Sequence, residues 1–221
     1  MNTITDHSNS TSPAHTSASL VLTVTDKLQK AQEYKARGNK YYEQQKYNAA
    51  IKKYNFCFAY LGGRGSQSAA DAYKSMIPQW NATTTAPIET ADEKLTREHL
   101  KAVVHQNIAM CYLKQKTHNP YTKIVRLKRI TKAIDHCNWA LEIQPTSWKV
   151  LCLQATAFLL TEDAPRGFMC LKLAKSSVTE PKVLRMIARL DKKMTRLQIK
   201  LQKRNKKSTT KFAKRLQRAF S

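Results

Sequence analysis

The sequence predicts an all-α protein, and three observations support this prediction. The 221 residues include only five glycines and seven prolines, too few for an all-β fold with many tight turns. Hydrophobic residues make up 42% of the chain, which is enough for a packed core and argues against wholesale disorder. Between residues 26 and 201, apolar side chains recur at the three- and four-residue spacing of helices.

The predicted helices lie in a repeat region over residues 26–180. It follows a Ser- and Thr-rich stretch, residues 1–25, that we expect to be a disordered leader. The first helix is expected to begin at a capping Asp26. Two insertions are predicted within the region, over residues 62–97 and 117–130. Helices are predicted over residues 26–45, 47–61, 98–116, 130–143, 148–160 and 167–177, and a basic capping helix and tail over residues 181–221.

The helices pair into units with a shared pattern. A unit of about 34 residues, with small residues where its two helices cross and bulky ones between them, is typical of the tetratricopeptide repeat (TPR). Three such units follow one another in one phase, at about residues 31–61, 102–145 and 148–180. An unrelated helical bundle with small residues at its crossings is the alternative. The matching residues are Tyr34, Gly38, Tyr41, Tyr47, Ala50, Tyr54 and Cys57; then Ile108, Ala109, Tyr112, Ala133, Cys137, Ala140 and Pro145; then Leu151, Ala155, Phe158, Gly167, Leu171 and Ala174.

These motifs resemble a known family. The segments KARGN, NIAMCYLK and WKVL, in this order, are similar to the TPR domain of the large immunophilin co-chaperones. The length of the chain and the insertion after the first unit resemble the tetratricopeptide repeat protein 9 family. The resemblance covers about residues 26–200 and implies a three-repeat TPR superhelix closed by a long basic capping helix. It also implies a binding module whose groove holds the acidic C-terminal peptide of heat-shock protein 90 or 70.

The resemblance assigns four residues of a carboxylate clamp. They are Lys35, Asn39, Asn107 and Lys149, whereas Leu153 stands where the family has an arginine. Lys35 and Asn39 are four residues apart and therefore share one helix face. Ammonium and amide groups from three neighbouring helices can bind a carboxylate together. A groove for another peptide remains an alternative, as does a purely structural use of these residues.

The C-terminal segment carries a second candidate site. Residues 181–221 hold 15 basic residues and one acidic residue, Asp191. Up to about Leu197 an apolar stripe predicts a capping helix, while Phe212, Leu216 and Phe220 form a smaller amphipathic element further on. Such a tail can bind RNA, a ribosome or an anionic membrane, pair with another helix, or stay solvated. Its basic residues are Lys203, Arg204, Lys206, Lys207, Lys211, Lys214, Arg215 and Arg218.

Catalytic and metal-binding motifs are missing from the sequence. There is no GxxxxGK, GxSxG or HExxH motif, and the five cysteines form no CxxC pair. The six histidines show no ligand spacing, and His105 falls on a core position of the second unit. We therefore expect a non-enzymatic protein without a metal or cofactor. The sequence lacks an apolar run long enough for a transmembrane helix or a signal peptide, so we expect a cytoplasmic location.

Overall fold

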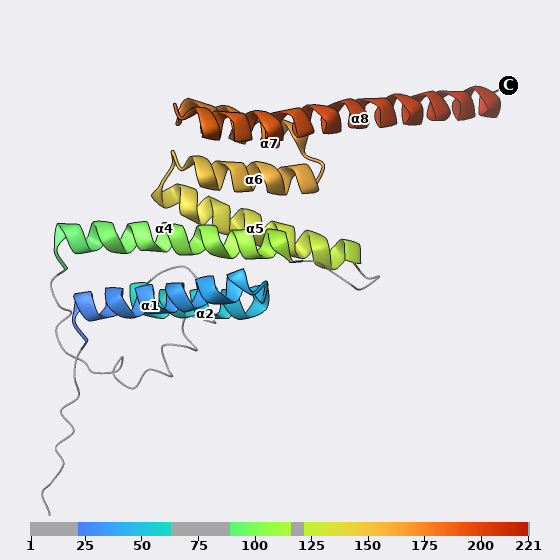
Figure 1. Ribbon diagram of the computed structural model, residues 1–221. Coiled ribbons are helices and arrows are strands. Elements are labelled where there is room, and N and C mark those ends of the chain that lie inside the picture. The colour runs from blue at the N-terminus through green and yellow to red at the C-terminus, as the bar shows by residue number, and fades with distance from the viewer. Residues whose placement is uncertain (1–21, 63–88, 116–121, 221) are drawn as a thin grey trace, which may run out of the picture.

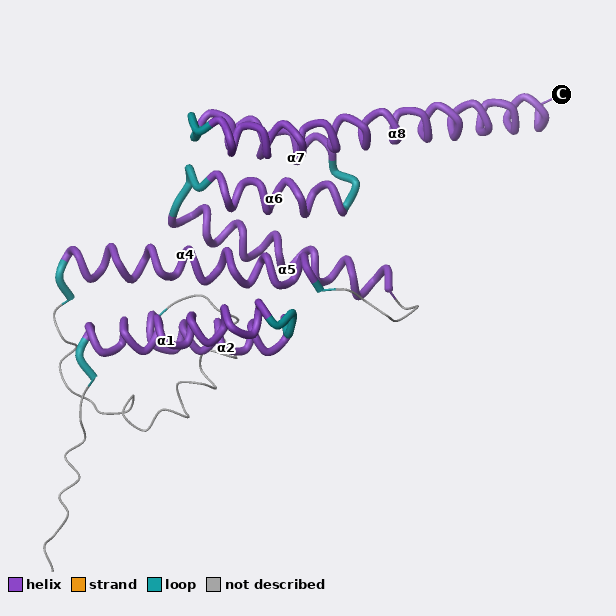
Figure 2. Tube along the Cα trace, in the orientation of Figure 1, coloured by secondary structure: helices purple, strands orange, loops and turns teal. Residues whose placement is uncertain are grey.

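The computed structural model describes residues 22–62, 89–115 and 122–220, which are almost entirely helical. The predicted all-α class is confirmed for these residues, which contain no strand. The helices stack one above another in chain order (Figures 1 and 2). Their bounds are α1 Val24–Glu43, α2 Tyr47–Leu61, α4 Ala91–Lys114, α5 Thr122–Ile143, α6 Trp148–Leu160, α7 Ala164–Ser176 and α8 Pro181–Phe220.

The stack is built from three helix pairs and a final unpaired helix. Helices α1 and α2, α4 and α5, and α6 and α7 pack against each other as antiparallel pairs, and α8 covers the last pair (Figure 1). The first helix of each pair also contacts the first helix of the next, so that α1, α4, α6 and α8 form a continuous inner wall. Helices α2, α5 and α7 each pack on the next inner helix. This is the connectivity that three consecutive repeats and a capping helix require.

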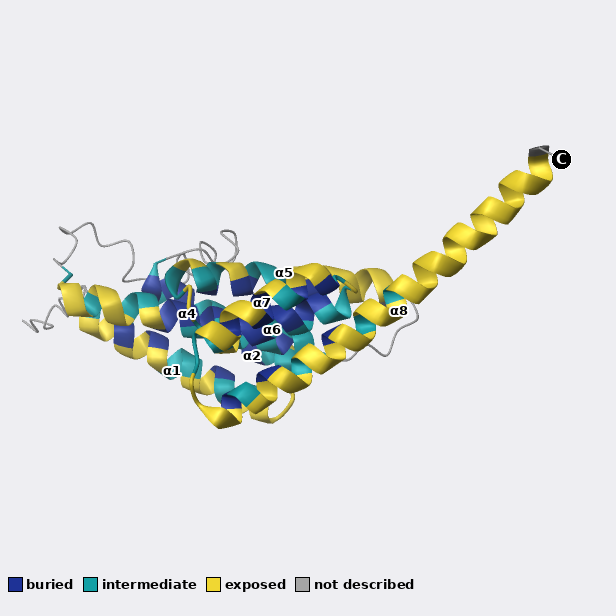
Figure 3. Cartoon of the chain, turned by 90° about the horizontal axis from the view of Figure 1, so that it is seen from above, coloured by how far each residue is buried: buried dark blue, intermediate teal, exposed yellow. Residues whose placement is uncertain are grey.

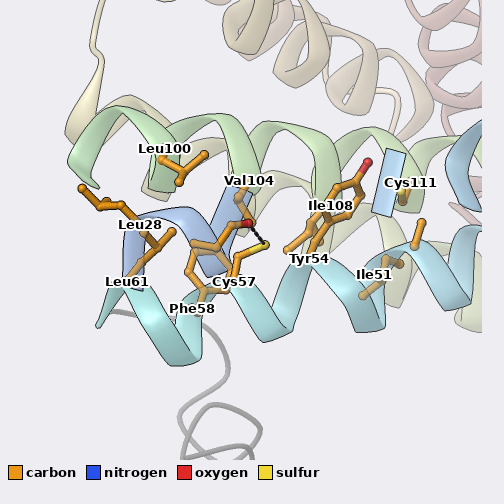
Figure 4. Close-up of a cluster of buried hydrophobic side chains, with 12 residues drawn as sticks. Leu28, Ile51, Tyr54, Cys57, Phe58, Leu61, Leu100, Val104, Ile108 and Cys111 are labelled. Atoms are coloured by element: carbon orange, nitrogen blue, oxygen red, sulfur yellow. Dashed lines mark hydrogen bonds between the residues drawn. The ribbon is translucent and has the colours of Figure 1, made fainter. Parts of the chain in front are cut away.

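Small residues allow the helices of a pair to approach closely. Within the first pair Ala31, Ala50 and Cys57 are fully buried, and the Cys57 thiol donates to the carbonyl of Ala31 (3.3 Å; Figure 4). A Cβ atom at Gly38 would lie 2.5 Å from Cε1 of the buried Tyr54 ring. The Tyr54 ring therefore leaves no room for a side chain at position 38.

The substitution Gly38→Ala is expected to destabilise the fold by about 1–3 kcal/mol, because the Tyr54 ring is rigid and cannot move aside without strain. The gain of about 1 kcal/mol in helix propensity offsets part of this cost. Gly167→Ala is the matched control, since its Cβ would meet the flexible methyl end of Met194. Urea unfolding of both variants measures the difference. Equal losses in both variants would contradict this explanation.

All five cysteines lie in the core, as the sequence predicts, and all are free. Burial raises the pKa of the Cys57, Cys111 and Cys137 thiols to about 12. A thiol with such a pKa stays protonated near neutral pH and is a weak nucleophile. These cysteines therefore act as small apolar core residues.

Four helices, α1, α4, α5 and α7, begin earlier than predicted, and α7 begins at Ala164 instead of residue 167. Thr23, not Asp26, caps α1, and Asp26 closes the capping box by accepting from the Thr23 backbone N–H (3.0 Å). Hydrogen bonds from Thr23 lower the pKa of the Asp26 carboxyl. The same box between Thr90 and Glu93 starts α4 at Ala91, inside the predicted insertion 62–97.

The second insertion also ends early, because α5 begins at Thr122 rather than at residue 130. Residues 1–21 of the expected leader and residues 63–88 and 116–121 of the two insertions lie outside the described residues. Residues 91–97 and 122–130 instead lengthen the helices of the second pair.

Helix α8 is one continuous helix of 40 residues. The predicted basic capping helix and tail form one helix over the described residues, because neither glycine nor proline interrupts the sequence after Pro181. Val183, Ile187 and Met194 are buried in a cluster shared with α6 and α7, as a capping helix requires. From Gln202 to Ala219 every residue is exposed, and this part extends away from the stack (Figure 3). Across the described ranges, no helix combines the length and hydropathy needed to cross a membrane.

Candidate peptide-binding groove

The four predicted clamp residues all lie on helices of the inner wall. Lys35 and Asn39 are on α1, Asn107 is on α4, and Lys149 is on α6. Helix α4 contacts both α1 and α6. Side chains that point from the same side of these three helices therefore lie on one surface. Leu153 lies one turn after Lys149 on α6.

Asn39 and Asn107 are in direct contact. The Asn39 Oδ1 atom accepts hydrogen bonds from Asn107 Nδ2 (3.3 Å) and from the Tyr54 hydroxyl (2.8 Å). Burial raises the pKa of the Tyr54 hydroxyl, so that it remains a donor. With Oδ1 occupied by two donors, the Asn39 amide nitrogen is left to donate to a ligand. The three side chains join α1, α2 and α4 and fix the orientation of both amides.

Lys35 and Lys149 carry unpaired charges beside this wall. Neither ammonium group has an acidic partner within ion-pair distance among the described residues. Lys35 is half-buried one turn before Asn39. Lys149 is exposed, with its Nζ 5.6 Å from the centroid of the Trp148 ring. Both cations are therefore available to an anionic ligand.

A hollow of about 390 Å³ lies where α4, α6 and α8 meet, and Lys149 is one of the residues that line it. Leu153 lines it, so the side chain in the expected arginine position adds apolar surface and no donor. Gln106 of α4 also lines the hollow, whereas Asn39 and Asn107 are not among its lining residues. Further apolar lining comes from Met110, Met186 and Leu190.

The structure thus assembles the predicted clamp only in part. It brings Asn39 and Asn107 together and places Lys35 one turn away on the same helix. Lys149 makes no hydrogen bond to either asparagine in the part of the chain that the structure describes. The Tyr54 hydroxyl, which orients Asn39, was not predicted, although its position opposite Gly38 in the repeat pattern places it near that turn.

A buried histidine pair was also not predicted. His105 on α4 and His136 on α5 lie Nδ1 to Nδ1 at 2.9 Å, with Phe58 and Trp139 against their rings. Burial, followed by the nearby Lys101 charge, lowers the pKa of His105 to about 4. Burial, followed by repulsion from His105 and then from Lys132, lowers the pKa of His136 to about 3. At neutral pH one ring therefore donates and the other accepts.

The histidine pair gives no sign of metal binding. The residues that the structure describes contain no group of three or more His, Cys, Asp or Glu side chains arranged to hold a metal ion. The two histidines are 31 positions apart and form no sequence motif, so only the repeat pattern, which places His105 in the core, hinted at the pair. Its role is to satisfy two polar groups inside the second helix pair.

The eight basic tail residues all lie on the last part of α8. Each of them is exposed. Arg204 pairs with Glu162 in the turn before α7 at 2.8 Å. This ion pair joins the start of the tail to the stack.

The helix pairs, the small residues at their crossings and the capping helix define a TPR domain. Comparison with solved structures finds the C-terminal TPR-containing domain of an FK506-binding protein from Plasmodium falciparum, with a TM-score of 0.54 and 18% sequence identity. The match covers 86% of this chain and 99% of that domain. The predicted TPR superhelix is thereby confirmed.

A curated protein is similar in sequence. Over 138 residues, 62% of this chain, the sequence is 27% identical to peptidyl-prolyl cis-trans isomerase FKBP4 of Bos taurus. The match spans 23% of the length of that isomerase. No protein-family model matches the chain. The chain is a TPR protein whose repeats resemble those of the immunophilins, as predicted, while the likeness to the tetratricopeptide repeat protein 9 family stays a prediction.

Proposed function

We propose that this chain is a non-catalytic adaptor whose inner wall binds the acidic C-terminal peptide of a protein partner. The likeness to the immunophilins suggests the acidic C-terminal peptides of heat-shock proteins 90 and 70. The observation that carries the proposal is the contact between Asn39 and Asn107, beside the unpaired charge of Lys35. A cytoplasmic location belongs to the same proposal.

The chemistry of the four side chains suits a terminal carboxylate. Lys35 and the free amide nitrogen of Asn39 donate to its oxygens, and charge-assisted bonds of this kind are about twice as strong as neutral ones. The Tyr54 hydroxyl holds the Asn39 amide in place before the ligand arrives, which reduces the entropy lost on binding. Lys149 then pairs with an acidic side chain of the peptide. The hollow that Lys149 and Leu153 line takes an apolar side chain of the peptide.

Calorimetric titration with a peptide ending in Glu-Glu-Val-Asp, at about 0.15 M salt, tests the proposal. We expect saturable binding that Lys35→Ala weakens at least tenfold, about 1.4 kcal/mol, because one charge-assisted hydrogen bond is lost. The matched control is Lys40→Ala, an exposed lysine five residues along α1 and about 140° around the helix from Lys35.

The amidated peptide separates the clamp from general attraction to a basic protein. Amidation removes the terminal charge but leaves the acidic side chains, so binding should fall as far as it does with Lys35→Ala. Equal binding of the two peptides, or equal losses from Lys35→Ala and Lys40→Ala, would refute the clamp.

The second candidate function uses the basic tail on RNA, a ribosome or an anionic membrane. The exposure of all eight basic residues from Lys203 to Arg218 favours it. The two functions separate by location. Lys149→Glu removes peptide binding alone, whereas a chain that ends after Lys200 loses only the tail activity.

A further inference from the structure

The last part of α8 does more than cap the repeats. The ion pair between Arg204 and Glu162 joins α8 to the described part of the stack near the point where the helix leaves it. The part from Asn205 to Phe220, which we call the overhang, remains helical and stands clear of the other helices (Figure 3). A capping function requires none of these residues, because the buried stripe of α8 ends before them.

The overhang has two distinct faces. Successive residues of an α-helix are about 100° apart, which places Phe212 and Leu216 on one side together with small and neutral residues. Phe212 is 63% exposed and Leu216 43% exposed. The opposite half of the helix carries every charge, all of it positive: Lys206, Lys207, Lys211, Lys214, Arg215 and Arg218.

A second exposed segment of the same character lies at the same end of the molecule. The first two turns of α5 expose Ile124 (68%) and Leu127 (41%) among three exposed basic residues, Lys123, Arg126 and Lys128. In both views the start of α5 and the overhang lie at one end of the stack (Figures 1 and 3). Two helical segments about 80 residues apart in sequence thus give this end both positive charge and exposed apolar side chains.

We propose that the overhang binds an anionic phospholipid bilayer, lying in its interface. The basic half attracts acidic headgroups, while Phe212 and Leu216 enter the boundary with the acyl chains. The start of α5 lies at the same end of the stack and offers further positive charge and exposed apolar side chains. Single-stranded RNA would account for the charge and would stack on Phe212, but it gains little from Leu216, Ile124 or Leu127.

Flotation of the full chain with vesicles tests this proposal. We expect binding to vesicles of phosphatidylcholine with about 30% phosphatidylserine, and none to pure phosphatidylcholine, at about 0.15 M salt. The double variant Phe212→Gln and Leu216→Gln keeps all charges and should bind at least tenfold more weakly. The matched control is Ile199→Gln, which removes an exposed apolar side chain from the charged side of α8 and should bind as the parent does. Circular dichroism of each variant checks that α8 remains helical.

A parallel titration with a single-stranded RNA of about 20 nucleotides decides between the two anionic partners. Membrane binding is supported if the double variant loses vesicle binding while its RNA affinity is unchanged. The proposal is overturned if the chain binds neither vesicle, binds both compositions equally, or binds anionic vesicles equally well with and without the apolar pair. Lys35→Ala should leave vesicle binding unchanged, so this result is independent of the peptide groove.

Discussion

Lowering the pH from 7 to 5 is expected to reduce the free energy of unfolding by about 4 kcal/mol, or about 2 kcal/mol for each of His105 and His136. Their folded pKa values of about 4 and about 3 lie below the ordinary value for histidine, because both rings are buried. At pH 5 the unfolded chain takes up two protons that the folded chain excludes. The contribution of the two histidines to the free energy of unfolding is therefore fully present above about pH 6.5, and it is lost as the pH falls toward 4.

Urea unfolding followed by circular dichroism at pH 7, 6 and 5 measures this loss. Replacing both histidines, His105→Gln with His136→Gln, should flatten the dependence on pH, because amides do not titrate in this range. His99 is exposed and forms a hydrogen bond with Gln144, so His99→Gln is the control. Its free energy of unfolding should change with pH as much as that of the parent protein. A parent protein equally stable at pH 7 and pH 5 would contradict the neutral histidine pair.

The substitution Leu153→Arg is expected to tighten binding of the acidic peptide by about 10- to 150-fold, about 1.5–3 kcal/mol. Arginine presents a planar fork of donors that matches a carboxylate, and the position lies one turn after Lys149 on the same helix. The hollow of about 390 Å³ beside Leu153 has room for the longer side chain. Titration with the carboxylate peptide and its amidated form measures the gain.

Two controls separate a specific contact from added charge. Leu173→Arg places the same guanidinium on α7, at an exposed site outside the lining of the hollow, and should change affinity little. Leu153→Met keeps the hollow apolar and should bind as the parent does. If Leu173→Arg tightens binding as much as Leu153→Arg, the position of Leu153 has no special relation to the ligand.

The repeat fold was predictable because small and bulky residues alternate in a fixed pattern. Gly38 and Tyr54 occupy positions that a TPR reserves for a small and a large residue, and the structure puts one against the other. The start of α4 was also within reach of sequence analysis, since Thr90 and Glu93 have the spacing of a capping box. The insertion around it obscured this signal.

Contacts between distant residues were not predictable in the same way. The Nδ1 atoms of His105 and His136 meet only because α4 and α5 pack at a particular depth, and nothing local in the sequence encodes that depth. The candidate clamp shows the same limit. Sequence spacing places Lys35 and Asn39 on one face, but the bonds from Tyr54 and Asn107 to Asn39 depend on how three helices cross.

The single unbroken helix α8 also has a mechanical consequence. Met186 and Leu190 line the hollow near its start, whereas its last 16 residues extend about 24 Å beyond the ion pair at Arg204. A stiff rod supported at one end acts as a lever. A tilt of about 5° at the hollow would move the far end of α8, about 45 Å away, by about 4 Å. A displacement of Met186 would thus be transmitted along the helix to Arg218.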